Sequence, residues 1–276
     1  MKRNILIENI RSKKSYLCVG LDTDVDRLPT HLPKTKEGIV SFNKAIIDAT
    51  AAHCISYKIN TAFYEVLGSK GWEAMEETVA YIPNTHFKIA DAKRGDIGNT
   101  GQQYARAFFE TLNFDAVTVA PYMGEDSIRP FLEYDNKWAI VLGLTSNKGA
   151  KDFELQQLDS NFTDTQRRAT YLYEQVLETV SKWGSPDNTM FVIGATQATE
   201  FSNIRSIVPN HFLLVPGVGF QGGSLAAVSK YGMNNDIGLL VNVSRAIIFA
   251  SKSENFAEEA KAIAAQYHFE MENYFS

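Results

Sequence analysis

Cysteine is scarce in this sequence of 276 residues, which contains only Cys18 and Cys54. Each lies among apolar neighbours, as is typical of small buried thiols. Two such thiols do not make the disulfide framework that stabilises small secreted proteins. The cysteine content therefore excludes a disulfide-rich protein and favours a reducing compartment.

Excess positive charge is also absent, because 27 Lys and Arg residues stand against 32 Asp and Glu residues, for a net charge of −5. No block of five like charges occurs anywhere in the sequence. Nucleic acids and anionic membrane surfaces are normally bound by clustered basic residues. We therefore expect neither a nucleic-acid partner nor a membrane partner.

Long hydrophobic runs are missing as well. The most apolar long stretch, residues 237–250, contains Asn242, Ser244 and Arg245 and is shorter than the roughly 20 residues of a membrane-spanning helix. Near the N-terminus, Glu8 and Arg11 interrupt the apolar core that a signal peptide requires. We expect a soluble protein of the cytoplasm.

Strand-like and helix-like segments alternate along the whole chain. Short β-branched runs end at Gly, Pro, Asp or Asn, and each is followed by a stretch with helical spacing. The predicted strands are residues 16–22, 55–60, 86–91, 116–121, 138–144, 190–195, 212–216 and 237–243. The predicted helices include residues 38–52, 65–81, 100–112, 164–183, 197–207, 223–230 and 255–267.

Most of the predicted strands are apolar at successive positions, as expected for a parallel sheet that is covered on both faces. The strand starts are mostly one βα unit apart. Eight such units predict the α/β class and a (β/α)₈ (TIM) barrel.

One domain over residues 1–276 is preferred, because no repeat, low-complexity tract or linker marks a boundary. The exception to the regular spacing is a polar insertion at about residues 145–162, after the fifth strand. Thr163 and Gln166 form a capping-box pattern at the start of the helix that follows. An insertion after a strand is expected on the active face of a barrel.

Charged residues gather where the predicted strands end. Asp22 follows the first strand, Lys58 lies on the second, and Asp91 and Lys93 lie at the end of the third. Asp91 and Lys93 are two residues apart on an extended segment, so their side chains should leave on the same side, towards the barrel mouth. An isolated Asp-x-Lys is more often a structural ion pair, but the neighbouring Lys58 favours a functional cluster.

The last two strands are followed by residues suited to an anion. Residues 216–223 read Pro-Gly-Val-Gly-Phe-Gln-Gly-Gly, and Ser244 and Arg245 follow the eighth strand. Glycines let backbone N–H groups approach an anion, and arginine offers a forked cation. Because the loops after strands seven and eight form the usual phosphate site of this fold, we expect a phosphate group there.

The five histidines show no metal-ligand spacing. Asp22 and Asp91 are the residues that could in principle contribute to a metal site. We expect no metal and no cofactor.

Taken in order, these motifs resemble the orotidine 5′-phosphate decarboxylase family, in its longer bacterial subfamily. The resemblance runs from Asp22 to Arg245. Its motifs are Lys58, the segment Asp91-Ala-Lys93-Arg-Gly-Asp96-Ile-Gly-Asn-Thr100, the segment 216–223 and Ser244-Arg245, with Phe-Tyr-Glu at 63–65 and Ala-Pro-Tyr-Met-Gly at 120–124. Asp-x-Lys-x-x-Asp alone is shared with a wider group of phosphate-binding barrels, whereas the four motifs together are specific.

The resemblance implies a catalytic tetrad of Lys58, Asp91, Lys93 and Asp96. It also implies a homodimer, in which Asp96 and Thr100 reach into the site of the neighbouring subunit. The substrate-binding residues that it implies are Asp22, Thr100, Ser146, Gly219, Gln221 and Arg245. Among them, Asp22 and Lys58 would hold ribose hydroxyls, Gln221 would bridge pyrimidine and phosphate, and Arg245 would clamp the phosphate. Ser146 would read the pyrimidine, although Thr145 or Asn147 could take that role.

The implied reaction is the decarboxylation of orotidine 5′-monophosphate to uridine 5′-monophosphate, in pyrimidine biosynthesis. Two other hypotheses remain. A metal-dependent sugar-phosphate aldolase or decarboxylase of the wider group shares Asp-x-Lys-x-x-Asp, but it would have an acidic metal ligand where this chain has Lys58. A non-catalytic nucleotide-binding barrel would not need two lysines and two aspartates at one carbon atom.

Overall fold

The fold is a closed barrel of eight parallel strands. The computed structural model describes residues 1–158, 170–219 and 222–275, and within these the strands pair in chain order, with β8 closing onto β1. The strands are β1 (Leu17–Gly20), β2 (Ser56–Asn60), β3 (Phe87–Arg94), β4 (Ala116–Val119), β5 (Trp138–Leu144), β6 (Thr189–Ile193), β7 (Phe212–Pro216) and β8 (Leu239–Val243). The predicted (β/α)₈ barrel is confirmed.

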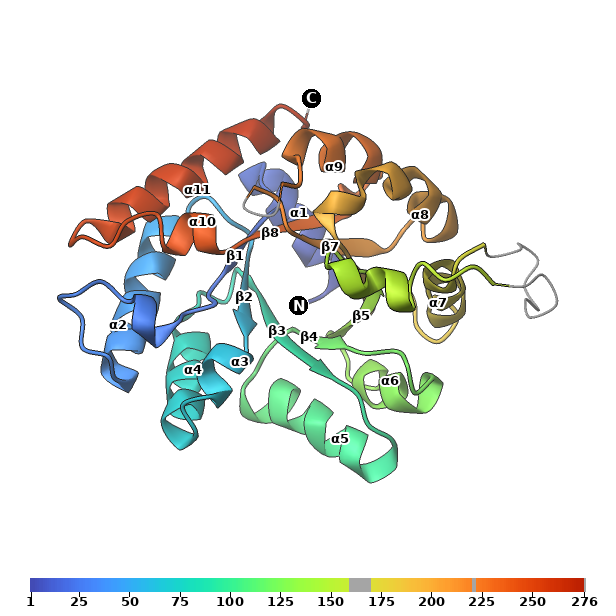
Figure 1. The fold of residues 1–276 in the computed structure, drawn as a ribbon, viewed down its shortest axis with the longest axis horizontal. Coiled ribbons are helices and arrows are strands. Elements are labelled where there is room, and N and C mark those ends of the chain that lie inside the picture. Colours follow the sequence, from blue (N-terminus) through green and yellow to red (C-terminus); the bar gives the residue numbers. More distant parts are fainter. Residues whose placement is uncertain (159–169, 220–221, 276) are drawn as a thin grey trace.

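Helices surround the barrel, as Figure 1 shows. They are α1 (Arg3–Lys13), α2 (Lys36–Thr50), α3 (Ala62–Glu65), α4 (Ser69–Tyr81), α5 (Gly98–Arg106), α6 (Glu125–Leu132), α7 (Leu172–Val180), α8 (Phe201–Ile207), α9 (Leu225–Gly232), α10 (Arg245–Ile248) and α11 (Phe256–Glu272). Shorter turns are the 3-10 helices η1 (Val25–Arg27), η3 (Lys148–Asp152) and η4 (Ala195–Glu200), and the π-helix η2 (Ala107–Thr111). The core lies between the strands and this outer layer, because the strands are buried along nearly their whole length.

Several predicted boundaries are wrong. The helix predicted at 65–81 is divided into α3 and α4, because Gly68 has a φ of +60°, which interrupts a right-handed helix. The third strand continues beyond Asp91 to Arg94, and the helix predicted at 100–112 ends as the π-helix η2. The helix predicted at 197–207 begins as the 3-10 turn η4 before α8.

The helix predicted at 164–183 begins, in its described part, at Leu172. Thr163 and Gln166 lie outside the described residues. The sequence patterns also missed the helices α1, α6 and α10.

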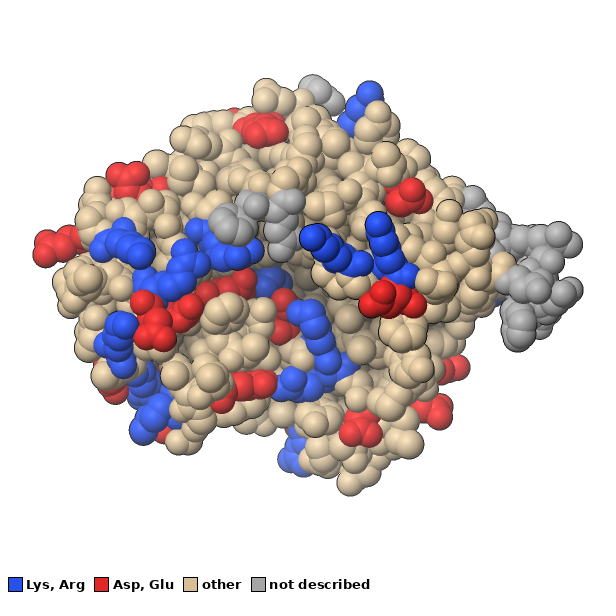
Figure 2. All heavy atoms as spheres, viewed as in Figure 1, with Lys and Arg blue, Asp and Glu red and all other residues tan. Residues whose placement is uncertain are grey.

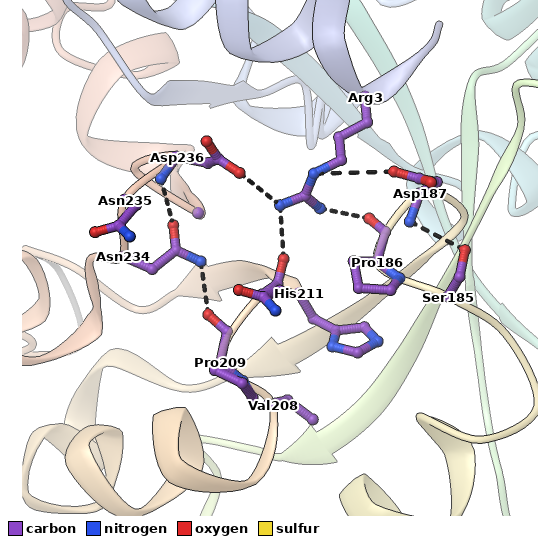
Figure 3. A network of polar contacts seen from close by, with 12 residues as sticks. Arg3, Ser185, Pro186, Asp187, Val208, Pro209, His211, Asn234, Asn235 and Asp236 are labelled. Carbon is purple, nitrogen blue, oxygen red and sulfur yellow. Dashed lines mark hydrogen bonds and ion pairs between the residues drawn. The ribbon is translucent and has the colours of Figure 1, made fainter.

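Helix α1 closes the N-terminal end of the barrel. Arg3 donates to the carbonyl oxygens of Pro186 (2.5 Å) and Asn210 (2.7 Å) and pairs with Asp236 (3.1 Å). Figure 3 shows Arg3 lying between Asp236 and the Pro186–Asp187 turn. These partners precede β6, β7 and β8, so α1 binds the strands where they begin. The opposite, C-terminal end of the barrel is left open for chemistry.

Candidate active site

Four charged side chains meet at the C-terminal end of β1, β2 and β3. The ammonium of Lys58 lies 3.1 Å from Asp22 Oδ1 and 3.1 Å from Asp91 Oδ2. The ammonium of Lys93 lies 2.6 Å from Asp91 Oδ1. The order Asp22, Lys58, Asp91, Lys93 therefore alternates in sign, which keeps closely spaced charges ionised.

Burial and the neighbouring charges shift the pKa values of Asp91 and Lys58 in opposite directions. Burial raises the pKa of Asp91, but the ammonium groups of Lys58 and Lys93 outweigh it and hold that pKa well below its ordinary value. Burial lowers the pKa of Lys58, and the carboxylates of Asp22 and Asp91 more than reverse this, so that its pKa is raised. Asp91 is thus an anion and Lys58 a cation at neutral pH.

Lys93 differs from its neighbours because its side chain is half exposed, with 52% of its surface accessible, whereas Lys58 is buried. Its backbone has a φ of 47°, in the left-handed region that few non-glycine residues adopt. The pairing of β3 with β4 shifts register between Ala90 and Arg94. The regular extended segment predicted for Asp91 and Lys93 is therefore wrong, and the two side chains meet through a bulge.

The bulge is held by Thr118 of β4, which the sequence patterns did not single out. Its hydroxyl accepts from the backbone N–H of Lys93 (2.9 Å) and donates to Asp91 Oδ1 (3.0 Å). The side chain of Thr118 is buried. A threonine within an apolar strand gives no signal of such a role, because register decides which residue of β4 faces Asp91.

A cavity of about 140 Å³ opens beside this row of charges. Figure 2 shows a hollow near the middle of this face, with acidic and basic side chains gathered around it. The cavity is lined by Asp22, Lys58, Asn60, Asp91, Pro216, Gly217, Val218, Asn242, Val243, Ser244, Arg245 and Ala246. The structure therefore brings three members of the charged row, the start of the glycine loop and Arg245 to one cavity. Lys93, the fourth member, reaches this group through its ion pair with Asp91.

The glycine loop after β7 is tightly folded. Gly217, Gly219 and Gly222 all have a positive φ, a conformation that glycine adopts without strain. The N–H groups of Gly219, Gly222 and Gly223 donate to carbonyl oxygens within the loop, so these three are not available to an anion. Gly219 is exposed at the rim, whereas Gln221 lies outside the described residues.

Ser146 lies directly after β5, beside η4. A Cβ atom on Gly194 would lie 2.6 Å from Ser146 N and 2.8 Å from its Cα, so only glycine fits there. The hydroxyl of the preceding Thr145 lies 2.8 Å from Glu154 Oε1. The same hydroxyl lies 2.5 Å from Asn147 Oδ1. Of the three residues predicted to read the pyrimidine, Thr145 and Asn147 therefore contact each other, and Thr145 also contacts Glu154.

Asp96 and Thr100 lie away from the charged row of their own chain. Asp96 is half-buried, and its Oδ1 accepts from the backbone N–H of Ile97 (2.8 Å), just before α5. Thr100 is exposed on α5. Within the described residues, neither Asp96 nor Thr100 forms a hydrogen bond or ion pair with Lys58, Asp91 or Lys93 of the same chain. Their role in the site of a neighbouring subunit stays a prediction.

No group of three His, Cys, Asp or Glu residues in the described ranges could hold a metal ion. The acidic row is interrupted by Lys58, whose ammonium occupies the space between Asp22 and Asp91. In those same ranges no helix is both long and apolar enough to cross a membrane.

Comparison with known proteins finds relatives that match nearly the whole chain. A family model described as "Orotidine 5′-phosphate decarboxylase / HUMPS family" matches residues 15–263. A Phocaeicola vulgatus protein named orotidine 5′-phosphate decarboxylase is 58% identical, over 96% of this chain and 97% of the relative. A Bacteroides fragilis protein of the same name is 56% identical, over 98% of this chain and 97% of the relative. The solved structure of Leishmania donovani OMP decarboxylase superposes with a TM-score of 0.80 at 36% identity, covering 98% of this chain and 99% of the other.

Proposed function

The chain belongs to the orotidine 5′-phosphate decarboxylase / HUMPS family, and on that premise we propose that its barrel mouth converts orotidine 5′-monophosphate into uridine 5′-monophosphate and CO₂. The observation that carries the proposal is the row of alternating charges in which Asp91 pairs with both Lys58 and Lys93. No cofactor takes part in the proposed reaction, which belongs to pyrimidine biosynthesis.

Lys93 is the proposed proton donor. Loss of CO₂ from C6 of the pyrimidine leaves a carbanion that no ring carbonyl delocalises directly, so a cation beside C6 must stabilise it. The exposed ammonium of Lys93 can stand beside that carbon and then deliver the proton that completes the product. Asp91 holds Lys93 in place and would repel the departing carboxylate.

The remaining residues bind the substrate away from C6. Asp22 and Lys58 hold the ribose hydroxyls, Ser146 reads the pyrimidine, and Arg245 clamps the phosphate. Gly219 borders the phosphate without donating to it, because its N–H is bonded to the carbonyl of Gly223. Gln221 bridges pyrimidine and phosphate. Arg245 supports this arrangement because it lines the same cavity as Asp22 and Lys58, so one nucleotide can contact both ends.

We also propose that the active form is a homodimer, in which Asp96 completes the tetrad of the neighbouring subunit and Thr100 binds its substrate. Ile97, next to Asp96 in the sequence, is exposed, and so are Tyr122 and Met123 after β4 and Phe153 after η3. The ring of Phe153 lies 6.5 Å from that of Tyr122. The segments that carry Ile97 and Tyr122 are adjacent, because the N–H of Ala120 donates to the carbonyl of Arg94. Such a patch on a soluble protein is typical of an interface, and a two-fold axis here would exchange Asp96 between the two mouths.

Mixed dimers test the shared site. Lys93→Ala and Asp96→Ala should each be nearly inactive, because each removes one tetrad residue from both sites. In a mixed dimer, one site combines the intact Lys93 of one chain with the intact Asp96 of the other. Random reassortment makes about half of the dimers mixed, so roughly a quarter of all sites should recover. If subunit exchange is demonstrated and no activity returns, Asp96 does not act across an interface.

The proposed reaction itself is tested by the loss of orotidine 5′-monophosphate absorbance with purified protein. Lack of turnover would contradict it.

A metal-dependent aldolase-type reaction is the second candidate, since the wider group shares Asp-x-Lys-x-x-Asp. We expect turnover to persist after exhaustive dialysis against EDTA, because Lys58 stands where a metal ligand would be needed; loss with EDTA and recovery with Mg²⁺ would favour the aldolase.

We further propose that residues 1–276 act as one domain, with the insertion at about 145–162 on the active face, and that the protein works in the cytoplasm. Both cysteines are free and buried, which suits a reducing compartment. The net charge of −5 supports a small nucleotide as the partner rather than a nucleic acid or a membrane.

A further inference from the structure

The segment after β5 is fixed by side-chain contacts that have no role in the proposed reaction as described above. Glu154 lies beyond η3, and its carboxylate accepts from the backbone N–H of Thr145 (2.7 Å) and from the Thr145 hydroxyl (2.8 Å). From the other side, the side-chain amide of Gln197 donates to the Thr145 carbonyl (3.2 Å). The Thr145 hydroxyl also lies 2.5 Å from Asn147 Oδ1. The polar groups of Thr145 are thus engaged by three side chains, those of Glu154, Asn147 and Gln197.

Glu154 is itself anchored to the scaffold. Its backbone carbonyl accepts from the N–H of Tyr173 in α7 (2.9 Å), and the N–H of the next residue, Leu155, donates to the carbonyl of Ala150 (3.0 Å). The backbone that carries this carboxylate is therefore hydrogen-bonded to helix α7.

These contacts leave Ser146 little freedom. Its backbone is pressed against Gly194 on one side, and the residue before it is held at its N–H, hydroxyl and carbonyl. Sheet pairing of β5 with β6 shifts register after Leu142 and resumes at Leu144, whose carbonyl accepts from the N–H of Gly194 (2.8 Å). The contacts of Thr145 begin where this pairing ends and fix the residue directly before Ser146.

We propose that Glu154 is a positioning residue, which orients Ser146 towards the pyrimidine ring through its two hydrogen bonds to Thr145. The inference rests on the proposed function and adds a role for the insertion after β5. A side chain that recognises a ligand through a directional hydrogen bond binds it less tightly when the contacts that position the side chain are removed. The polar groups of ligand and site are then poorly paired.

The test compares two competitive inhibitors of the wild-type enzyme, one with a base and one without. Uridine 5′-monophosphate contacts both ends of the site, whereas ribose 5-phosphate has no pyrimidine. In Glu154→Ala the inhibition constant of uridine 5′-monophosphate should rise roughly tenfold, and that of ribose 5-phosphate should stay unchanged. An equal rise for both inhibitors, or no change for either, would overturn the proposal.

Two variants separate hydrogen bonding from charge. Glu154→Gln keeps an acceptor for the Thr145 N–H and should bind uridine 5′-monophosphate nearly as the wild type does. If it loses as much as Glu154→Ala, the negative charge matters and the positioning role is wrong. Asp152→Ala, which removes a neighbouring exposed carboxylate, is the matched control and should change neither constant.

If Glu154→Ala fails to fold, Thr145→Val removes the hydroxyl contacts with Glu154 and Asn147 and keeps the N–H contact with Glu154. It should raise the inhibition constant of uridine 5′-monophosphate and leave that of ribose 5-phosphate unchanged. An unchanged constant in that variant would also overturn the proposal. The outcomes remain distinct from those for the proposed function, because a wild-type protein that does not consume orotidine 5′-monophosphate contradicts the reaction, whereas an active wild type with unaltered variants contradicts only the role of Glu154.

Discussion

The ammonium of Lys93 lies 2.6 Å from Asp91 Oδ1 although Lys93 itself has a left-handed backbone, with a φ of 47°. A non-glycine residue pays about 1–2 kcal/mol for that conformation. The hydrogen bonds of Thr118 to Lys93 N and Asp91 Oδ1 offset part of this strain. Thr118 therefore fixes the relative position of the proton donor and its carboxylate partner.

The first prediction concerns Thr118→Val, which replaces the hydroxyl by a methyl group of similar size. It leaves the Lys93 N–H and one Asp91 oxygen without that partner, at a cost of about 1–3 kcal/mol. We expect kcat to fall at least about tenfold, since Lys93 loses its alignment, with a smaller change in KM. Steady-state kinetics and thermal unfolding measure both effects.

Thr189→Val is the matched control, because Thr189 is also buried but lies at the opposite, N-terminal end of its strand. It should lower the melting temperature and leave kcat unchanged. If both variants retain wild-type kcat, the hydroxyl of Thr118 does not position Lys93.

The barrel could be predicted from the sequence because the residues of each strand indicate by themselves that the strand is buried. Runs such as Trp138–Leu144 are apolar on both faces and are bounded by polar turns, so that local composition and spacing suffice. Helix α1 gave no comparable signal. Its fully buried side chains are only Leu6 and Ile10, and much of its attachment comes from Arg3 binding loops that are far away in the sequence.

The charged row was predictable for a similar reason, since Asp22 follows β1, and Lys58 and Asp91 lie near the C-terminal ends of β2 and β3, at one edge of the barrel. The residues that orient it were not. Thr118 acts through the register of β4, and Glu154 acts through the fold of an insertion that sequence patterns describe only as polar. Contacts that depend on how strands and loops are placed in three dimensions produce no periodic pattern in the sequence.

The second prediction concerns Arg245→Ala at the proposed phosphate end. The loss of a forked, charge-assisted contact should remove about 2–3 kcal/mol of transition-state stabilisation, and kcat/KM should fall accordingly. Adding phosphite to a truncated substrate, which lacks its phosphate, should stimulate the wild type more than the variant. Lys230→Ala, which removes an exposed cation on α9, is the control; unchanged kcat/KM in Arg245→Ala would place the phosphate elsewhere.

The third prediction concerns the loss of folding stability at acidic pH, which is called the acid limb below. Burial first, and then the charges of Arg3 and Arg205, lower the pKa of His211 to about 4 from its ordinary 6.5. The unfolded chain therefore binds more protons than the folded chain between these values, so this histidine contributes stability above pH 6.5 that is lost as the pH falls towards 4. Neither ring nitrogen of His211 has a hydrogen-bond partner among the described residues.

His211→Phe should accordingly flatten the decline of the melting temperature between pH 6.5 and pH 4, and it should not destabilise the protein at pH 7, because no hydrogen bond is lost. The ring already packs against Phe191, with centroids 5.4 Å apart. His31→Phe, at an exposed position, should leave the decline as in the wild type. A decline equally steep in His211→Phe would show that other groups govern the acid limb.

The last prediction concerns Gly194→Ala, which tests the close approach of η4 to Ser146. The added Cβ would meet the backbone of Ser146 at 2.6–2.8 Å, and backbone atoms held by the Thr145 contacts cannot move aside without breaking them. We expect the KM for orotidine 5′-monophosphate to rise by roughly tenfold or more, with overpacking costing about 1–3 kcal/mol of stability. Gly149→Ala is the control in the same segment, because its Cβ would meet only the ends of two side chains, Asn147 Nδ2 at 3.1 Å and Asp152 Oδ2 at 3.6 Å, and no backbone atom within 4 Å. Kinetics that are unchanged in Gly194→Ala, in a folded protein, would mean that Ser146 has room to shift and that its position does not govern binding of the pyrimidine.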